Sequence, residues 1–236
     1  MFTKDDWMTG ILGVTTYHLK VPNKDADLTN HLKGQSLENH LGEKEIFSDV
    51  KLSTSEIELV SQIETLGYNL VDTNVTFDIE IEKKNLKGKS VVEKANESDR
   101  EMTATIASKS FEYSRFHLDH KIKKKSANLL KEKWVENYFY GKRGDNMLLA
   151  KVGDEVAGFI QLLERGNDVI IDLIGVSSDF RRQYIAHDLM AETCNLYPNK
   201  KKIIVGTQVS NIPSVRMYEN FGFRLCDSSY VFHYHT

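Results

Sequence analysis

The segment from residue 169 to residue 223 constrains the fold of this chain more than any other part. It reads VIIDLIGVSSDFRRQYIAHDLMAETCNLYPNKKKIIVGTQVSNIPSVRMYENFGF. An apolar run leads into a turn with two arginines and a helical pattern, and a second apolar run leads into Asn211 and another helical pattern. Two successive strand–turn–helix units place both turns at one end of a sheet, where helix N-termini attract anions. The segment therefore predicts a site for a phosphate-bearing ligand.

The surrounding pattern predicts a mixed sheet. Residues 147–176 read as a hairpin followed by a third strand, which makes an antiparallel meander. The strand at 202–208 is almost continuously apolar, as a parallel strand buried on both faces would be. The sheet should change from antiparallel to parallel between strands 169–176 and 202–208. Parallel neighbours that splay apart would leave a cleft between their carboxyl ends. The predicted fold class is α/β (α+β), a mixed, mostly antiparallel sheet flanked by helices.

The first hundred residues predict a smaller α+β unit. Residues 10–21 read as short strands, 53–66 as a helix and 68–81 as a half-buried strand. The charge-dense stretch 82–101 is the best candidate boundary. We therefore expect an N-terminal α+β domain over residues 1–95 and a second domain over residues 96–236.

Three further segments carry expectations about local structure. Residues 23–42, with His31 and His40, read as a loop or a solvated helix, and residues 102–108 read as a short strand. Two final strands are expected around a turn at Asp227.

Composition excludes several classes of function. The net charge is −3, without the basic excess typical of nucleic-acid binding. No apolar run approaches the ~18 residues of a membrane helix, and the N-terminus lacks a signal-peptide pattern, so we expect a cytoplasmic protein without a membrane span. Cys194 and Cys226 lack metal or redox spacing. His233 and His235 should share one sheet face and not act as ligands, so no metal is expected.

The turn after the first apolar run resembles the acyl-CoA-binding motif of the GNAT N-acyltransferases. That motif is Arg or Gln, two residues, Gly, one residue, then Gly or Ala. Arg181 fills the first position and Ala186 the last. Tyr184 stands where the family usually has glycine, which is a departure from the pattern.

Residues 211–223 resemble the second signature of the same family. Asn211 opens a helix, Tyr218 follows seven residues later, and Gly-Phe closes the segment. The resemblance covers roughly residues 102–236. It implies the GNAT fold and acetyl-CoA as co-substrate. It also implies that residues 96–236 form the acetyl-CoA-binding catalytic domain and that residues 1–95 lie on the side of the acceptor substrate.

The resemblance also implies where acetyl-CoA binds. A helix N-terminus with unpaired amides suits the pyrophosphate, and the end of the preceding strand would pair with the pantetheine amides. The expected binding residues are Ile174, Gly175, Val176, Arg181, Arg182, Gln183, Tyr184, Ile185, Ala186, His187 and Asn211.

Two residues are candidates for the chemistry. A thiolate whose conjugate acid has a pKa near ~8.5 leaves when an amine attacks a thioester, and Tyr218 can protonate it. The alternative is that Tyr218 is a core aromatic residue. Asp172 is a carboxylate inside an apolar strand, which normally demands a reason. It is a candidate for the base, for a substrate hydrogen-bond partner or for a structural role.

Within the superfamily, the sequence resembles most the TDP-fucosamine acetyltransferases. Ser114-Arg115-Phe116, Gly206-Thr207-Gln208 and the join at residues 66–72 carry this likeness. It implies a TDP-linked 4-amino-4,6-dideoxy sugar as acceptor, for surface polysaccharide synthesis, with Arg115 and the lysines at 121–125 near its diphosphate. Two alternatives stay open: another acceptor, such as a protein N-terminus or small amine, and a non-catalytic acyl-CoA sensor. A homodimer is compatible with the sequence.

Overall fold

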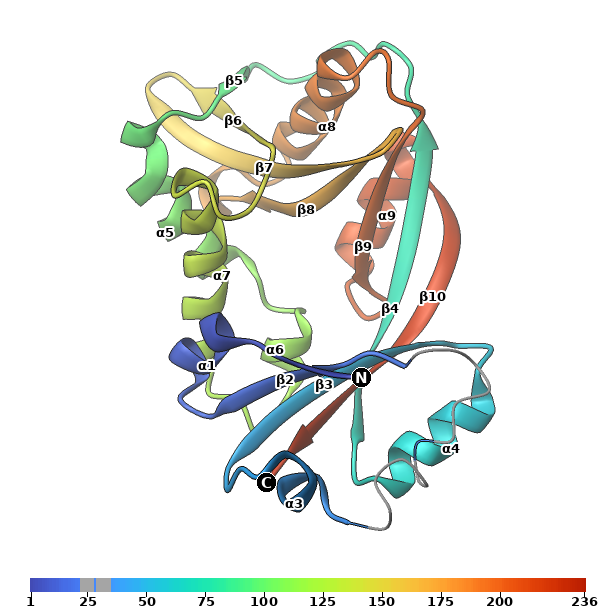
Figure 1. Ribbon diagram of the computed structural model, residues 1–236. Helices are drawn as coiled ribbons and strands as arrows, with labels where there is room; N and C mark the ends of the chain where they lie inside the picture. The colour runs from blue at the N-terminus through green and yellow to red at the C-terminus, as the bar shows by residue number, and fades with distance from the viewer. Residues whose placement is uncertain (22–27, 29–34) are drawn as a thin grey trace.

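The computed structural model describes residues 1–21, residue 28 and residues 35–236. Both strands and helices occur in each half of the chain (Figure 1). Their order is β1 (Phe2–Lys4), α1 (Asp6–Leu12), β2 (Thr15–Leu19), α3 (Leu37–Leu41), β3 (Ile46–Ser53), α4 (Ile57–Thr65), β4 (Asn69–Glu80), β5 (Val91–Lys94), α5 (Arg100–Ser110), α6 (Arg115–Leu118), α7 (Lys124–Phe139), β6 (Asn146–Val152), β7 (Glu155–Arg165), β8 (Asp168–Val176), α8 (Ile185–Leu196), β9 (Lys202–Gln208), α9 (Ile212–Phe221) and β10 (Arg224–His235).

All of these strands join one ten-stranded sheet in the order β1-β2-β3-β10-β4-β9-β8-β7-β6-β5. The pairs β2–β3 and β8–β9 are parallel, and the other neighbours are antiparallel. The prediction of a mixed, mostly antiparallel sheet is confirmed. So is the change of direction between the strands at 169–176 and 202–208.

The sheet runs through the candidate domain boundary at residue 95. Strand β4 lies between β10 and β9, and β5 lies at the far edge beside β6 (Figure 1). The stretch 82–101 holds β5 and the start of α5 in addition to connecting chain. The boundary therefore coincides with no break in the sheet, and the division into an acceptor side and a catalytic side stays a prediction.

Helices cover both faces of strands β6 to β8. On β6, Leu148 and Ala150 pack into the cluster formed with α8 and α9, whereas Met147 and Leu149 pack into the cluster formed with α5 and α7. Successive side chains of a strand point to opposite faces, so this alternation requires apolar residues in a row. That explains why residues 147–150 form a continuous apolar run in the sequence.

Two sequence expectations about strands were wrong because helices form there instead. Residues 102–108 lie in α5, where Thr103, Ala104, Ile106 and Ala107 form a buried helical stripe. The β-branched content of this segment favours a strand, but tertiary packing overrides that preference. Residues 10–12 likewise end helix α1, which stops at Gly13 in the left-handed conformation (φ 76°).

The two final strands predicted around Asp227 are one strand, β10. Its pairing with β4 shifts between Leu225 and Asp227, so Cys226 is an extra, bulged residue and no turn forms. Most of the segment 23–42, including His31, lies outside the described residues, and His40 lies in α3.

Candidate acyl-transfer site

Strands β8 and β9 part half-way along their length. They pair from Asp168–Lys202 to Ile171–Val205. Beyond that point β8 stays paired with β7 as far as Val176, and β9 stays paired with β4 as far as Gln208. The carboxyl halves of β8 and β9 are thus held by their outer neighbours while the ladder between them has ended.

A β-bulge lies where the two strands part. Leu162 of β7 faces Ile171, and Gln161 faces Leu173, which leaves Asp172 as the extra residue. A bulge bends its strand and increases the local twist. Here it also resets the alternation, because Ile171 packs against the α8 side while Leu173 packs against the α5 side.

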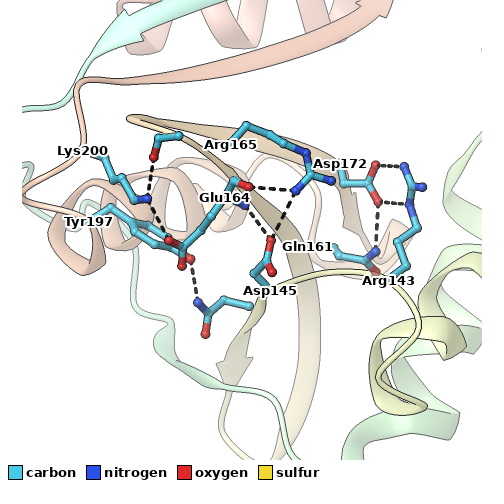
Figure 2. Close-up of polar contacts among 10 residues, drawn as sticks. Arg143, Asp145, Gln161, Glu164, Arg165, Asp172, Tyr197 and Lys200 are labelled. Atoms are coloured by element: carbon cyan, nitrogen blue, oxygen red, sulfur yellow. Dashed lines mark hydrogen bonds and ion pairs between the residues drawn. The ribbon is translucent and has the colours of Figure 1, made fainter.

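The carboxylate of Asp172 is the acceptor for three side chains. Arg143 donates to both of its oxygens, from Nε and Nη2 at 2.7 Å each (Figure 2). Trp134 Nε1 lies 2.9 Å from Oδ2, and Gln161 Nε2 lies 3.0 Å from it. The side chain of Asp172 is only 8% exposed. Its buried charge is therefore compensated by a bidentate guanidinium and two neutral donors.

Helix α8 begins without a side-chain cap. Tyr184, at its N-cap position, has φ 64° and accepts the first helical bond from Asp188 N at 2.9 Å. The amides before Asp188 have no intrahelical partner, as at any helix start. The φ of Tyr184 lies in the left-handed region that favours glycine. Glycine, which the family pattern has at this position, would adopt this φ without strain, and in this chain tyrosine adopts it.

The start of α8 packs closely on the end of β8. A Cβ built on Gly158 of β7 would lie 2.8 Å from the Gly175 carbonyl and 2.9 Å from Ile185 Cγ2. The missing side chain at Gly158 lets the helix approach the strand. The candidate residues Ile174, Gly175 and Val176 therefore lie beside the first turn of α8, which carries Ile185, Ala186 and His187. Arg181, Arg182 and Gln183 are exposed in the turn before it.

Helix α9 carries the two remaining candidates. Asn211 is its N-cap: its side-chain oxygen accepts from Ser214 N (3.3 Å), and its amide donates to Thr207 Oγ1 (3.2 Å). Tyr218 is 3% exposed, and its ring centroid lies 5.5 Å from that of Phe223. Among the described residues, its hydroxyl makes no hydrogen bond. Burial raises the pKa of Tyr218, so the hydroxyl keeps its proton.

A cavity of about 330 Å³ opens beside the Asp172 network. Trp134 and Arg143, which hold Asp172, form part of its wall, and Arg115 forms another part. Its lining consists of Asp5, Trp7, Met8, His18, Arg115, Trp134, Asn137, Lys142 and Arg143. The structure therefore brings Arg115 and the surroundings of Asp172 to one cavity. Most of the lining comes from residues that the sequence did not single out.

His18 lies in this wall between two carboxylates. Its Nδ1 is 2.7 Å from Asp49 and its Nε2 is 2.9 Å from Asp5. The hydrogen bond with Asp49 is the main reason that the pKa of His18 is raised. Asp49 also pairs with Arg115 at 2.5 Å. Asp49 lies in β3, whose sequence IFSDVKLS mixes apolar and polar residues, so the argument that identified Asp172 does not identify this residue.

A buried carboxylate ties the connecting segment to α8. Asp188 is fully buried and accepts from the amides of Lys87 (2.8 Å) and Gly88 (2.9 Å) and from the Ser90 hydroxyl. Burial alone would raise the pKa of Asp188, but these hydrogen bonds outweigh burial and lower it. The segment is fixed across the first turn of α8 by this residue.

Residues 107–223 match the acetyltransferase (GNAT) family. This range includes the parted strands, the uncapped start of α8 and all of α9. The chain contains a GNAT acetyltransferase domain. The resemblance drawn from Arg181, Ala186 and the 211–223 signature is confirmed.

The chain is also similar to a curated protein and to several solved structures. The spore coat polysaccharide biosynthesis protein SpsD of Bacillus subtilis (strain 168) is 32% identical over 137 residues, which cover 57% of this chain and 47% of that protein. The chain thus spans about half the length of this relative.

Two solved structures show that the likeness in fold extends over nearly the whole chain. A GCN5-related N-acetyltransferase from Sphaerobacter thermophilus has a TM-score of 0.65 at 14% identity, covering 94% of this chain and 72% of the other. A conserved protein of unknown function from Staphylococcus epidermidis ATCC 12228 has a TM-score of 0.64 at 15% identity, covering 96% and 87%. In the part of the chain that the structure describes, no helix has the length and apolar character to cross a membrane.

Proposed function

We propose that this protein transfers the acetyl group of acetyl-CoA to the primary amine of a sugar nucleotide. The observation that carries the proposal is the bulge at Asp172 inside a GNAT domain. It lies where β8 and β9 part, and Asp172 binds two residues of the neighbouring cavity wall. The acyl donor then belongs between the parted strands, and the acceptor belongs in the cavity.

The donor side is supported by the start of α8. Free amides and the positive end of the helix dipole suit the pyrophosphate of acetyl-CoA. Arg181 and Arg182 add exposed positive charge in the preceding turn. The unpaired edge of β8 from Ile174 to Val176 suits the pantetheine amides, and an N–H there can stabilise the oxyanion that forms on the thioester carbonyl.

Tyr218 is the proposed general acid. The amine nitrogen forms a bond to the thioester carbon, and collapse of the tetrahedral intermediate breaks the carbon–sulfur bond. The departing thiolate takes the Tyr218 proton, and the proton lost by the amine restores it through solvent. The hydroxyl makes no hydrogen bond among the described residues and burial raises its pKa, so it is protonated and its proton is not shared with another side chain there.

The acceptor class is supported by the cavity and by the relative. Arg115, Lys142 and Arg143 line one cavity together with Trp7 and Trp134. Guanidinium groups suit a diphosphate, and aromatic rings suit a base or sugar face. The relative named for spore coat polysaccharide biosynthesis favours a sugar over a peptide. The expected acceptor is the 4-amino group of a TDP-linked amino-deoxy sugar.

A panel of amines tests the proposal. Release of free thiol from acetyl-CoA is followed with TDP-linked 4-amino sugars, UDP-linked amino sugars, simple amines and peptides, with correction for hydrolysis. Thermal unfolding is measured with TDP, with CoA and with both. Turnover with the TDP-linked amine and stabilisation by TDP are expected.

The other outcomes separate the alternatives. Stabilisation by CoA without turnover of any amine would favour an acyl-CoA sensor. Preferred turnover of a peptide or simple amine would refute the sugar-nucleotide acceptor and leave the acetyltransferase intact.

A further inference from the structure

Asp119, His233 and His235 form a cluster with the character of a metal site. Asp119 Oδ2 lies 2.7 Å from His233 Nδ1 and 2.6 Å from His235 Nε2. The three candidate ligand atoms lie within 4.8 Å of one another. The exposed fractions of the side chains are 4% for Asp119, 1% for His233 and 15% for His235, so the cluster is enclosed and reached from the His235 side.

The fold preorganises these three side chains. His233 and His235 are two residues apart in β10, so their side chains leave the same face of the sheet. Their rings pack on Phe47 with centroids 4.8 and 5.1 Å away. Asp119 follows α6, and its Oδ1 accepts from Lys121 N at 2.9 Å. Each group is thus held by contacts outside the cluster.

The hydrogen bonds within this cluster leave one of its buried nitrogen atoms, His233 Nε2, without a partner among the described residues. Both imidazoles meet the same carboxylate oxygen, so both must donate a proton to it. His233 Nε2 is then a buried atom with no hydrogen-bond partner among the described residues. An unpaired buried polar atom costs about 1–3 kcal/mol. Asp49 lies directly opposite His233 in β3, and its Oδ2 likewise makes no hydrogen bond within the described chain, although it is ion-paired with Arg115.

We propose that Asp119, His233 and His235 bind a divalent transition metal ion of the zinc type. Two imidazoles and one carboxylate are ligands that such ions prefer, whereas calcium and magnesium prefer oxygen ligands alone. Ligation through Nδ1 leaves the proton of His233 on Nε2. Ligand bonds of about 2.0–2.2 Å require the three atoms to move apart by several tenths of an ångström.

The ion would connect α6 to β10. Asp119 directly follows α6, and Arg115 at the start of that helix lines the cavity. Loading the metal should therefore stabilise the position of Arg115 without touching the acyl-donor side. The proposal stands without the acetyltransferase activity, because metal binding is measured directly.

The test uses the full chain after treatment with a chelator. Zn²⁺ is titrated by calorimetry, and Co²⁺ is titrated while visible absorption reports its coordination. Asp119→Asn and His235→Ala remove one ligand each. His120→Ala is the matched control, because His120 adjoins Asp119 in sequence but is exposed and outside the cluster. Circular dichroism and thermal unfolding without metal establish that each variant folds.

One equivalent of Zn²⁺ should bind to the wild type and to His120→Ala and raise their unfolding temperatures. Both ligand variants should lose this rise, and the Co²⁺ absorption should disappear with them. The proposal is wrong if the wild type binds no metal, or if the ligand variants bind as tightly as the wild type. His235 is partly exposed, so His235→Ala gives a folded variant even if Asp119→Asn does not.

Discussion

Tyr218→Phe separates a catalytic hydroxyl from a core aromatic residue. General acids contribute roughly 10²–10⁴-fold to a reaction, so kcat should fall by about that factor. Stability should not fall, because the hydroxyl has no hydrogen-bond partner in the described part of the chain and its removal leaves no donor or acceptor unpaired. The ring contacts with Phe77 and Phe223 stay in place.

Tyr197→Phe is the matched control. Tyr197 is a buried tyrosine of the same core cluster, but its hydroxyl accepts from Asn146 Nδ2 at 2.6 Å. Losing that hydrogen bond should lower the free energy of unfolding by about 0.5–1.5 kcal/mol while turnover stays unchanged. The two variants should therefore show opposite patterns of stability and activity.

The assay is thiol release at saturating acetyl-CoA, with urea unfolding of the same preparations. Burial raises the pKa of Tyr218 above its ordinary value of 10.0, so wild-type kcat should not decline through loss of its proton below about pH 10. Full turnover by Tyr218→Phe would refute the general acid. A loss of turnover matched by an equal loss in Tyr197→Phe would show that packing, and not proton transfer, is responsible.

Three further changes test the structural basis of the site. Asp172→Ala leaves buried donors of Trp134 and Gln161 without an acceptor, so urea unfolding should show a loss of about 2–4 kcal/mol; an unchanged midpoint would contradict the network. Asp188→Asn should reduce the loss of the free energy of unfolding at acid pH. Because the pKa of Asp188 is lowered in the folded state, its contribution to stability is present above its unfolded pKa and is lost as the pH falls through the folded pKa. A plot of stability against pH that matches the wild type's from pH 7 to pH 3 would refute this role. Tyr184→Val should destabilise by about 1–2 kcal/mol, because a β-branched residue tolerates φ 64° poorly, whereas Tyr184→Gly should be nearly neutral; equal effects would show that backbone strain does not matter there.

The sequence predicts the second half of the chain better than the first. From residue 147 to residue 223, three apolar runs separated by turns are followed by two helical patterns with an apolar run between them. The strands, the helices and the change of direction between β8 and β9 can therefore be predicted from this part of the sequence. Residues 102–108 failed because threonine, isoleucine and alanine are compatible with either structure. Only the contact with α7 and β7 selects the helix there.

The elements that carry the candidate site were predicted, but the interactions of its residues were not. The turn at Arg181 and the helix of Tyr218 follow from local pattern. The partners of Asp172 do not, because Arg143, Trp134 and Gln161 are separated from it by 11 to 38 residues and meet it only in the fold. The bulge at Asp172 cannot be predicted from the sequence either, because it is a shift in the pairing of β7 with β8 and the sequence of neither strand shows it alone.

Asp172 is more informative as a bulged residue than as a lone carboxylate. An extra residue in β8 cannot keep both neighbouring ladders in register, and the ladder to β9 is the one that ends. The same insertion places Asp172 and Leu173 together on the α5 and α7 face, where the carboxylate receives Trp134 and Arg143. Both halves of the proposed site therefore depend on one local irregularity: the parting of the strands that would admit the acyl donor, and the placement of two side chains that line the acceptor cavity. An insertion that serves both purposes gives a structural reason for a charged residue inside this otherwise apolar strand.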